Sequence, residues 1–180
     1  ELICAPDECY APQVEFHTTP VFHHADNYIC LNPLLDRAVD GGVIDIELML
    51  SRDGFDWQRP FRATHFLARG PSGAFDAGSL FTNSTPIILG DEMRFYYGAY
   101  SQGATGADDR THESGVGVAM LPRDRFAGLG LVAHSDLPTQ REPLEHVGQV
   151  TLKPLALSRD SQLILNADAR GGSIRVEILS

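Results

Sequence analysis

The length, composition and charge of the chain exclude several classes of function before any motif is considered. Its 180 residues are 43% hydrophobic and 21% charged, which is the balance of a packed globular protein rather than a disordered one. The formal net charge of -10 would repel a phosphate backbone, so no nucleic-acid partner is expected. Every apolar run is far shorter than the roughly 20 residues that a membrane-spanning helix needs, so no membrane span is expected either.

Short runs rich in Val, Ile, Phe, Tyr and Thr alternate with glycine and proline along the whole chain, and no helix-length amphipathic period occurs. This is the pattern of strands joined by turns. Tight-turn signals such as Asp53-Gly54 and Gly90-Asp91 join several runs. The pattern predicts an all-β chain with strands, in order, at 12–22, 27–33, 43–51, 60–68, 79–89, 93–100, 115–122, 126–132, 148–157, 162–167 and 173–179.

Two sequence motifs occur twice. The stretch that begins at Met49 (MLSRDGF) returns 71 positions later at Met120 (MLPRDRF), and Thr19-Pro20 before an apolar pair returns 66 positions later as Thr85-Pro86. The extra residues fit a loop at 101–114, which has no strand pattern. Each repeat then holds four strands, as one blade of a β-propeller does. The alternative is that two pairs of hairpins share short turn motifs by chance.

The repeat predicts how the chain is divided into domains. Residues 1–137 would form two propeller blades, at about 10–68 and 74–132, residues 138–147 a linker, and residues 148–180 the first strands of a β-sandwich. Two blades cannot close a propeller and three strands cannot close a sandwich, because both would leave exposed edges. We therefore expect the remaining propeller blades to come from a missing segment or from another chain.

Three segments carry a resemblance to a known family: SRDGFDWQRP at 51–60, GAFDAG at 73–78 and GDEMRFYYG at 90–98. In this order they resemble the five-bladed β-propeller glycoside hydrolases of families 32 and 43, and residues 152–177 resemble the β-sandwich that follows such propellers. The resemblance implies cleavage of glycosidic bonds in a polysaccharide or oligosaccharide by paired carboxylates in a funnel on the propeller axis. We expect no cofactor and no metal, and an extracellular or periplasmic location. The Asn-Asp-Pro and Arg-Asp-Pro motifs of the family are absent, so part of the catalytic set would lie outside this chain.

Two acids are the candidate catalytic residues, because glycoside hydrolysis needs two carboxyl groups beside one bond. Glu8-Cys9 matches the Glu-Cys pair that carries the general acid in family 32. Asp76 would enter the second blade, and Gly78 after it would let a sugar approach the backbone closely. The alternatives are a solvated carboxylate for Glu8 and a turn-capping aspartate for Asp76.

Further residues are candidates for binding a carbohydrate substrate. Tyr96 and Tyr97 must point to opposite faces of one strand, so one of them can line the funnel. The loop at 101–114 can contact sugar hydroxyls or a charged substrate, since loops often carry function; it can equally be an ordinary solvated loop. The predicted substrate-binding residues are Asp7, Tyr97, Arg110, His112 and Glu113.

The remaining distinctive side chains favour structural roles. Trp57, Phe55 and Phe61 are expected in the blade core, and Cys4, Cys9 and Cys30 as buried free thiols. His23-His24 point to opposite faces of a strand and predict no metal site. Two other functions stay open: a non-catalytic carbohydrate-binding propeller, and a polysaccharide lyase, which would need an acidic substrate, a His or Tyr base and a neutralising Arg or metal.

Overall fold

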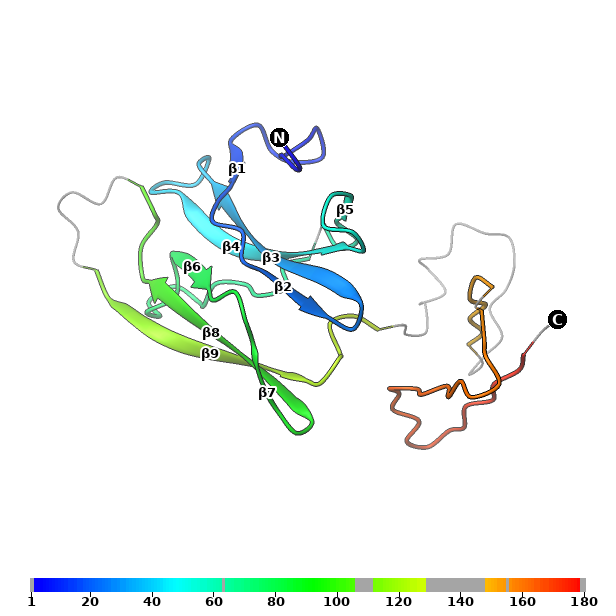
Figure 1. Ribbon diagram of the computed structural model, residues 1–180. Helices are drawn as coiled ribbons and strands as arrows, with labels where there is room; N and C mark the ends of the chain where they lie inside the picture. The colour runs from blue at the N-terminus through cyan, green and yellow to red at the C-terminus, as the bar shows by residue number, and fades with distance from the viewer. Residues whose placement is uncertain (1, 63, 106–111, 129–147, 155, 179–180) are drawn as a thin grey trace. The chain divides into compact units, whose positions relative to one another are not determined.

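The computed structural model describes residues 2–62, 64–105, 112–128, 148–154 and 156–178. They belong to two units, Glu1–Arg123 and Asp124–Ser180, which are described separately. The described residues of the first unit form nine strands in one mixed sheet and no helix (Figure 1). The all-β prediction is therefore confirmed. No helix in the described part of the chain is long and apolar enough to cross a membrane.

The strands of the first unit lie close to the positions that the sequence predicts. Pro20 divides the predicted strand 12–22 in two, and Pro86 divides the predicted strand 79–89 in the same way, since proline has no N–H for the ladder. The strands are β1 (Val14–Phe16), β2 (Val21–His24), β3 (Asn27–Asp36), β4 (Val43–Ser51), β5 (Trp57–Gln58), β6 (Ser79–Thr82), β7 (Ile87–Leu89), β8 (Glu92–Tyr100) and β9 (Ser114–Pro122).

The repeated motifs mark a repeated strand topology. β1 and β2 both pair with β3, which pairs with β4; β6 and β7 both pair with β8, which pairs with β9. Met49 lies opposite Cys30 on β3, and Met120 lies opposite Arg94 on β8, so the two Met motifs occupy the same place in each repeat. The repeats are joined by a parallel pairing of Ile44 in β4 with Ser79 in β6.

The hydrophobic core lies between the two repeats. The buried face of β3 and β4 includes Leu31 and Leu48, and that of β8 includes Met93 and Phe95. The Phe95 ring lies 6.3 Å from the ring of Phe22 in β2. Cys30 and Arg94 are equivalent residues of the two repeats, so Leu31 and Phe95, which follow them, are equivalent as well. The same face of each repeat therefore packs in the core. In a closed ring of repeats the contacts are head-to-tail instead, between different faces of neighbouring repeats, and the propeller blades remain a prediction.

The segment after β4 differs from the prediction. The described residues of 60–68 form no strand, and Leu67 makes only an isolated bridge with Ile46 of β4; Pro60 removes one donor, and the Thr64 N–H closes a turn onto the Phe61 carbonyl at 2.9 Å. Trp57, which is expected in the core, is half-buried, and its indole donates to the Gly54 carbonyl at 3.0 Å and holds the turn. Phe55 and Phe61 are exposed, so the prediction that they belong to the core is wrong.

The thiols also differ from the prediction. Of the three free cysteines, Cys30 on β3 is buried, Cys4 is half-buried and Cys9 is exposed. Burial, followed by the nearby charges of Cys4 and Glu47, raises the pKa of the Cys30 thiol to about 12. Cys30 alone therefore behaves as the buried thiol that the sequence predicts.

In the second unit, residues 124–128, 148–154 and 156–178 form no strand, and residues 148–154 and 156–178 are exposed. The strands predicted at 148–157, 162–167 and 173–179 are thus not formed in the described residues. Arg170 pairs with its near neighbour Asp168 at 2.6 Å, and Arg125 Nε donates to Asn166 Oδ1 at 3.0 Å across 41 positions. Apolar residues there have no sheet to pack against, and isolated strands are not stable in water. The predicted linker 138–147 lies outside the described residues, and the β-sandwich remains a prediction.

Candidate functional site

A cleft of about 740 Å³ opens in the first unit between the start of β4 and two loops. One loop is the stretch 65–78 before β6, and the other is 101–103 after β8. Asp45, His65 and Arg69 are its charged or titratable wall residues, together with Asp40. The cleft therefore combines residues from both repeats.

Asp45 organises this wall. Its side chain points to the face of β4 opposite Ile44 and Ile46, because side chains alternate along a strand. Its carboxylate accepts hydrogen bonds from the backbone N–H of Arg69 at 2.8 Å and from Arg69 Nε at 3.0 Å, and His65 Nδ1 lies 3.6 Å away. The His65 side chain is 43% exposed. A fixed acceptor and two kinds of donor thus border the cleft.

Backbone forms much of the remaining wall. A Cβ atom on Gly103 would lie 2.2 Å from the Gly41 carbonyl oxygen, and one on Gly78 would lie 2.0 Å from the Gln102 carbonyl oxygen. These separations leave no room for a side chain. The loops therefore approach each other closely and give the cleft a fixed shape.

Asp76 and Tyr97, both predicted from the sequence, lie together. The Tyr97 hydroxyl donates to Asp76 Oδ2 at 2.9 Å, and the Tyr97 ring stacks on Phe75 with an angle of 12° between the planes. Burial first, and then the hydrogen bond and charge of Asp76, raise the pKa of Tyr97. Asp76 Oδ1 lies against Gly70 of the cleft wall, where a Cβ would come within 2.0 Å of it. Asp76 therefore lies next to a wall residue of the cleft, but neither Asp76 nor Tyr97 is part of its lining.

The other candidate acid lies elsewhere. Glu8 is exposed in a turn of the N-terminal segment, and no hydrogen bond or ion pair in the described residues joins it to Asp76. Its neighbour Asp7 accepts hydrogen bonds from Arg59 at 2.6 Å and Arg62 at 2.9 Å. Partial burial works to raise the pKa of Asp7, but the Cys9 N–H and the two arginine charges outweigh it and lower that pKa. Asp7 therefore attaches the N-terminal segment to the residues that follow β5 through Arg59 and Arg62.

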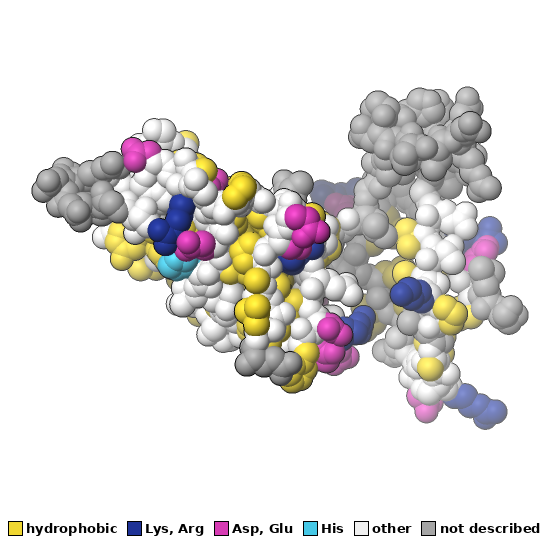
Figure 2. Space-filling model, turned by 90° about the horizontal axis from the view of Figure 1, so that it is seen from above, with side chains coloured by type: hydrophobic (Ala, Val, Ile, Leu, Met, Phe, Trp, Pro, Cys, Tyr) yellow, Lys and Arg dark blue, Asp and Glu magenta, His cyan; other side chains and the backbone are white. Residues whose placement is uncertain are grey.

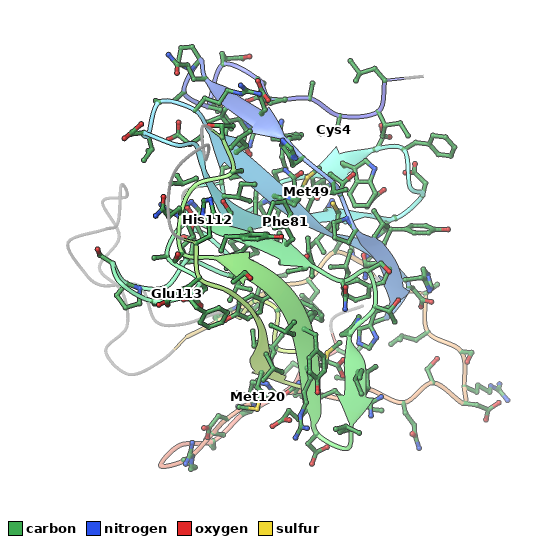
Figure 3. All side chains as sticks on the ribbon, turned by 90° about the vertical axis from the view of Figure 1, so that its left-hand side faces the viewer. Cys4, Met49, Phe81, His112, Glu113 and Met120 are labelled. Carbon is green, nitrogen blue, oxygen red and sulfur yellow. The ribbon has the colours of Figure 1, made fainter. Side chains whose placement is uncertain are left out.

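The predicted binding loop is described in part. His112 and Glu113 are exposed just before β9, and Figure 3 shows them on one side of the unit. The Glu113 N–H donates to Ser101 Oγ at 3.0 Å, and the Ser101 N–H donates to the Glu113 carbonyl at 2.9 Å. Ser101 lines the cleft, so the end of the loop is fixed beside it. Arg110 lies outside the described residues.

Sequence reasoning missed a second polar group on β4. Glu47 is only 1% exposed; Tyr10 donates to its Oε1 at 2.5 Å, and Asn32 Nδ2 donates to its Oε2 at 3.3 Å. The Arg59 guanidinium lies 5.2 Å from the centre of the Tyr10 ring. Burial first, and then the hydrogen bond and charge of Glu47, raise the pKa of Tyr10. The sequence signal that could have revealed Glu47 is the presence of two acidic residues, Asp45 and Glu47, in an otherwise apolar strand.

Among the described residues, no group of three or more His, Cys, Asp or Glu side chains is placed to hold a metal ion.

Comparison with known proteins gives a likeness of fold to a solved structure. No family model and no curated protein matches the chain. A solved BT0996 complex named for RGII, which is rhamnogalacturonan II, is similar with a TM-score of 0.50 and 13% sequence identity. The match covers 66% of this chain and 35% of that one, so the chain spans about a third of its length. At this identity the likeness shows the fold alone.

Proposed function

We propose that the chain binds a carbohydrate in the cleft beside Asp45. The observation that carries the proposal is the Asp45–Arg69–His65 group on the cleft wall, in which two hydrogen bonds join the Asp45 carboxylate to Arg69 and the His65 Nδ1 lies 3.6 Å from the same carboxylate. Neighbouring donors and acceptors suit the adjacent hydroxyls of a sugar ring, which both donate and accept hydrogen bonds. The similarity to a complex named for RGII supports carbohydrate as the ligand class.

The charges of the site favour a neutral sugar. Asp45 already neutralises Arg69, and the chain as a whole carries -10. A negative field repels an acidic sugar at distances up to the Debye length, about 8 Å at physiological salt. A polysaccharide lyase acting on uronates is for this reason less well supported than a binding protein for neutral saccharides.

The test is a calorimetric titration with neutral oligosaccharides, and with RGII fragments as the acidic comparison, using His65→Ala. Loss of one hydrogen bond to a sugar is expected to weaken binding about tenfold, which corresponds to ~1.4 kcal/mol. His23→Ala is the matched control, because His23 is also an exposed histidine but contacts the Tyr28 ring edge-on in the β2–β3 hairpin. No binding by the unmodified chain would overturn the proposal. Equal binding by His65→Ala and the unmodified chain would show that the wall formed by Asp45, His65 and Arg69 is not where the sugar binds.

A glycoside hydrolase is the second candidate, favoured by the Asp76 carboxylate beside the cleft and its bond from Tyr97. Glu8 would be the second acid, and the protein would act outside the cell or in the periplasm. Asp76→Asn should then abolish the release of reducing ends while sugar binding stays within about twofold. Glu8→Gln should do the same. Unchanged turnover in either variant removes that residue from catalysis.

A further inference from the structure

The N-terminal segment covers a polar face of the sheet. Residues 4–10 form no strand and loop above β3 and β4 (Figure 1). Tyr10 bonds to Glu47, Asp7 bonds to Arg59 and Arg62, and Arg59 Nη1 donates to the Ala5 carbonyl at 3.4 Å. Figure 2 shows the unit from above, with charged groups beside a band of hydrophobic side chains. A few side-chain contacts, and no strand pairing, hold the segment in place.

The face of the sheet under residues 4–10 contains a buried polar pair, Asn32 and Glu47. Asn32 and Glu47 are cross-strand partners, and their exposed fractions are 0% and 1%. The equivalent pair in the second repeat is Tyr96 and Val118. Asn32 Oδ1 has no hydrogen-bond partner among the described residues, and such a buried acceptor costs about 1–3 kcal/mol. Tyr96 and Val118 are exposed, whereas the Asn32–Glu47 pair is buried and leaves an acceptor unsatisfied, and a ligand hydroxyl would satisfy that acceptor.

The face of β4 that carries Glu47 also carries Asp45 of the cleft wall, although Glu47, Asn32, Tyr10 and Arg59 themselves do not line the cleft. Asp45 and Glu47 are two residues apart on β4 and point to the same side, about 6.5 Å from each other along the strand. Asp45 borders the cleft, and Glu47 lies under Tyr10. A ligand that extends along β4 from Asp45 therefore meets the Tyr10 ring next.

We propose that Glu47, Asn32 and Arg59 form a second sugar subsite beyond the cleft along β4, in which the Tyr10 phenol occupies the place of a ligand hydroxyl. The inference rests on the proposed carbohydrate binding. A sugar hydroxyl would donate to Glu47 Oε1 as Tyr10 does, and a second hydroxyl would donate to Asn32 Oδ1. Arg59, whose side chain is 8% exposed, would donate to a sugar oxygen, and residues 4–10 would move aside.

Tyr10→Ala tests the subsite by removing the phenol. Calorimetric titrations would use neutral xylo-, gluco- and galacto-oligosaccharides from the disaccharide to the hexasaccharide. We expect Tyr10→Ala to bind the longer members about tenfold more tightly than the unmodified chain does, with no change for the disaccharide. Tyr10→Phe keeps the ring and should show no gain. Adding Glu47→Gln to Tyr10→Ala should cancel the gain.

Asp7→Asn is the second variant, because it loosens the segment and keeps Tyr10. It should show a smaller gain with the same dependence on ligand length. A folded variant that shows no such gain overturns the subsite, while binding by the unmodified chain would leave the proposed function standing. Absence of binding by all forms overturns both. Loss of the native circular dichroism spectrum in both variants would show that residues 4–10 are needed for folding, and would also overturn the subsite.

Discussion

At the scale of single residues, alternation along β4 decides which polar groups meet. Asp45 and Glu47 lie on one face, but Asp45 finds Arg69 and His65 at the cleft while Glu47 finds Tyr10 and Asn32. Each carboxylate is buried with partners, as the cost of burying a lone charge requires. Two similar acids thus acquire different surroundings from the loops that cover them.

Gly117→Ala should disturb the Asp76–Tyr97 pair. A Cβ at Gly117 would lie 2.3 Å from Tyr97 Cζ, so the ring must move away from Phe75 and Asp76. We expect a loss of about 1–3 kcal/mol in the free energy of unfolding, typical of overpacking, measured by urea denaturation. Gly98→Ala on β8 is the control, because its Cβ would meet no atom within 4 Å. Equal losses in the two variants would contradict the prediction.

The sequence predicted part of this site and missed the rest for a physical reason. Asp76 and Tyr97 were both candidates, and the structure joins them by a hydrogen bond across 21 positions. Asp45 and Arg69 are 24 positions apart, and their contact depends on how the loop before β6 folds back over β4. Strand periodicity gives no information about such a loop.

At the scale of elements, the two repeats are held together by aromatic packing. Phe95 of β8 contacts Phe22 at 6.3 Å and Phe66 at 5.6 Å between ring centres. The three rings come from β2, from the loop before β6 and from β8. The core therefore depends on contacts that are remote in sequence.

Phe95→Ala should strongly destabilise the first unit. The side chain is 3% exposed, and its removal leaves a cavity between the repeats, with an expected cost of about 3–5 kcal/mol. Urea denaturation followed by tryptophan fluorescence measures this cost. Phe55→Ala removes a ring that is 66% exposed and should change stability by less than about 0.5 kcal/mol. A loss for Phe95→Ala no larger than for Phe55→Ala would contradict the assigned core.

Strand prediction succeeded where alternation and turn chemistry agreed. The range 43–51 matches β4, and the strands at 93–100 and 115–122 differ from β8 and β9 by one residue at one end. It failed at 60–68, where the pairing with β4 is limited to an isolated bridge between Leu67 and Ile46, and in the second unit, where the described residues form no strand. A strand needs a partner as well as a suitable sequence.

At the scale of the whole chain, the outer face of the second repeat is exposed and apolar. Val116, Val118 and Met120 on β9 lie beside Tyr96 and Tyr100 on β8, and all five are exposed. Among the described residues, β9 pairs with β8 alone. An apolar face next to a free edge is a common site of association.

Met120→Lys should reduce self-association of the purified chain. We expect light scattering of the unmodified chain to rise with protein concentration and that of Met120→Lys to rise less, because the charge must be desolvated in any contact between apolar faces. Ser114→Lys adds the same charge at the polar start of β9 and should have a smaller effect. An unmodified chain that stays monomeric at every concentration would contradict this prediction.

Because Cys30 is buried in β3, the rate at which its thiol reacts with a reagent would report local unfolding of that strand. At neutral pH its thiolate is scarce, because its pKa is about 12, whereas Cys9 is exposed. An alkylating reagent should therefore label Cys9 quickly and reach Cys30 only when the central hairpin of β3 and β4 separates. The slow labelling step would measure how often this part of the protein unfolds under native conditions.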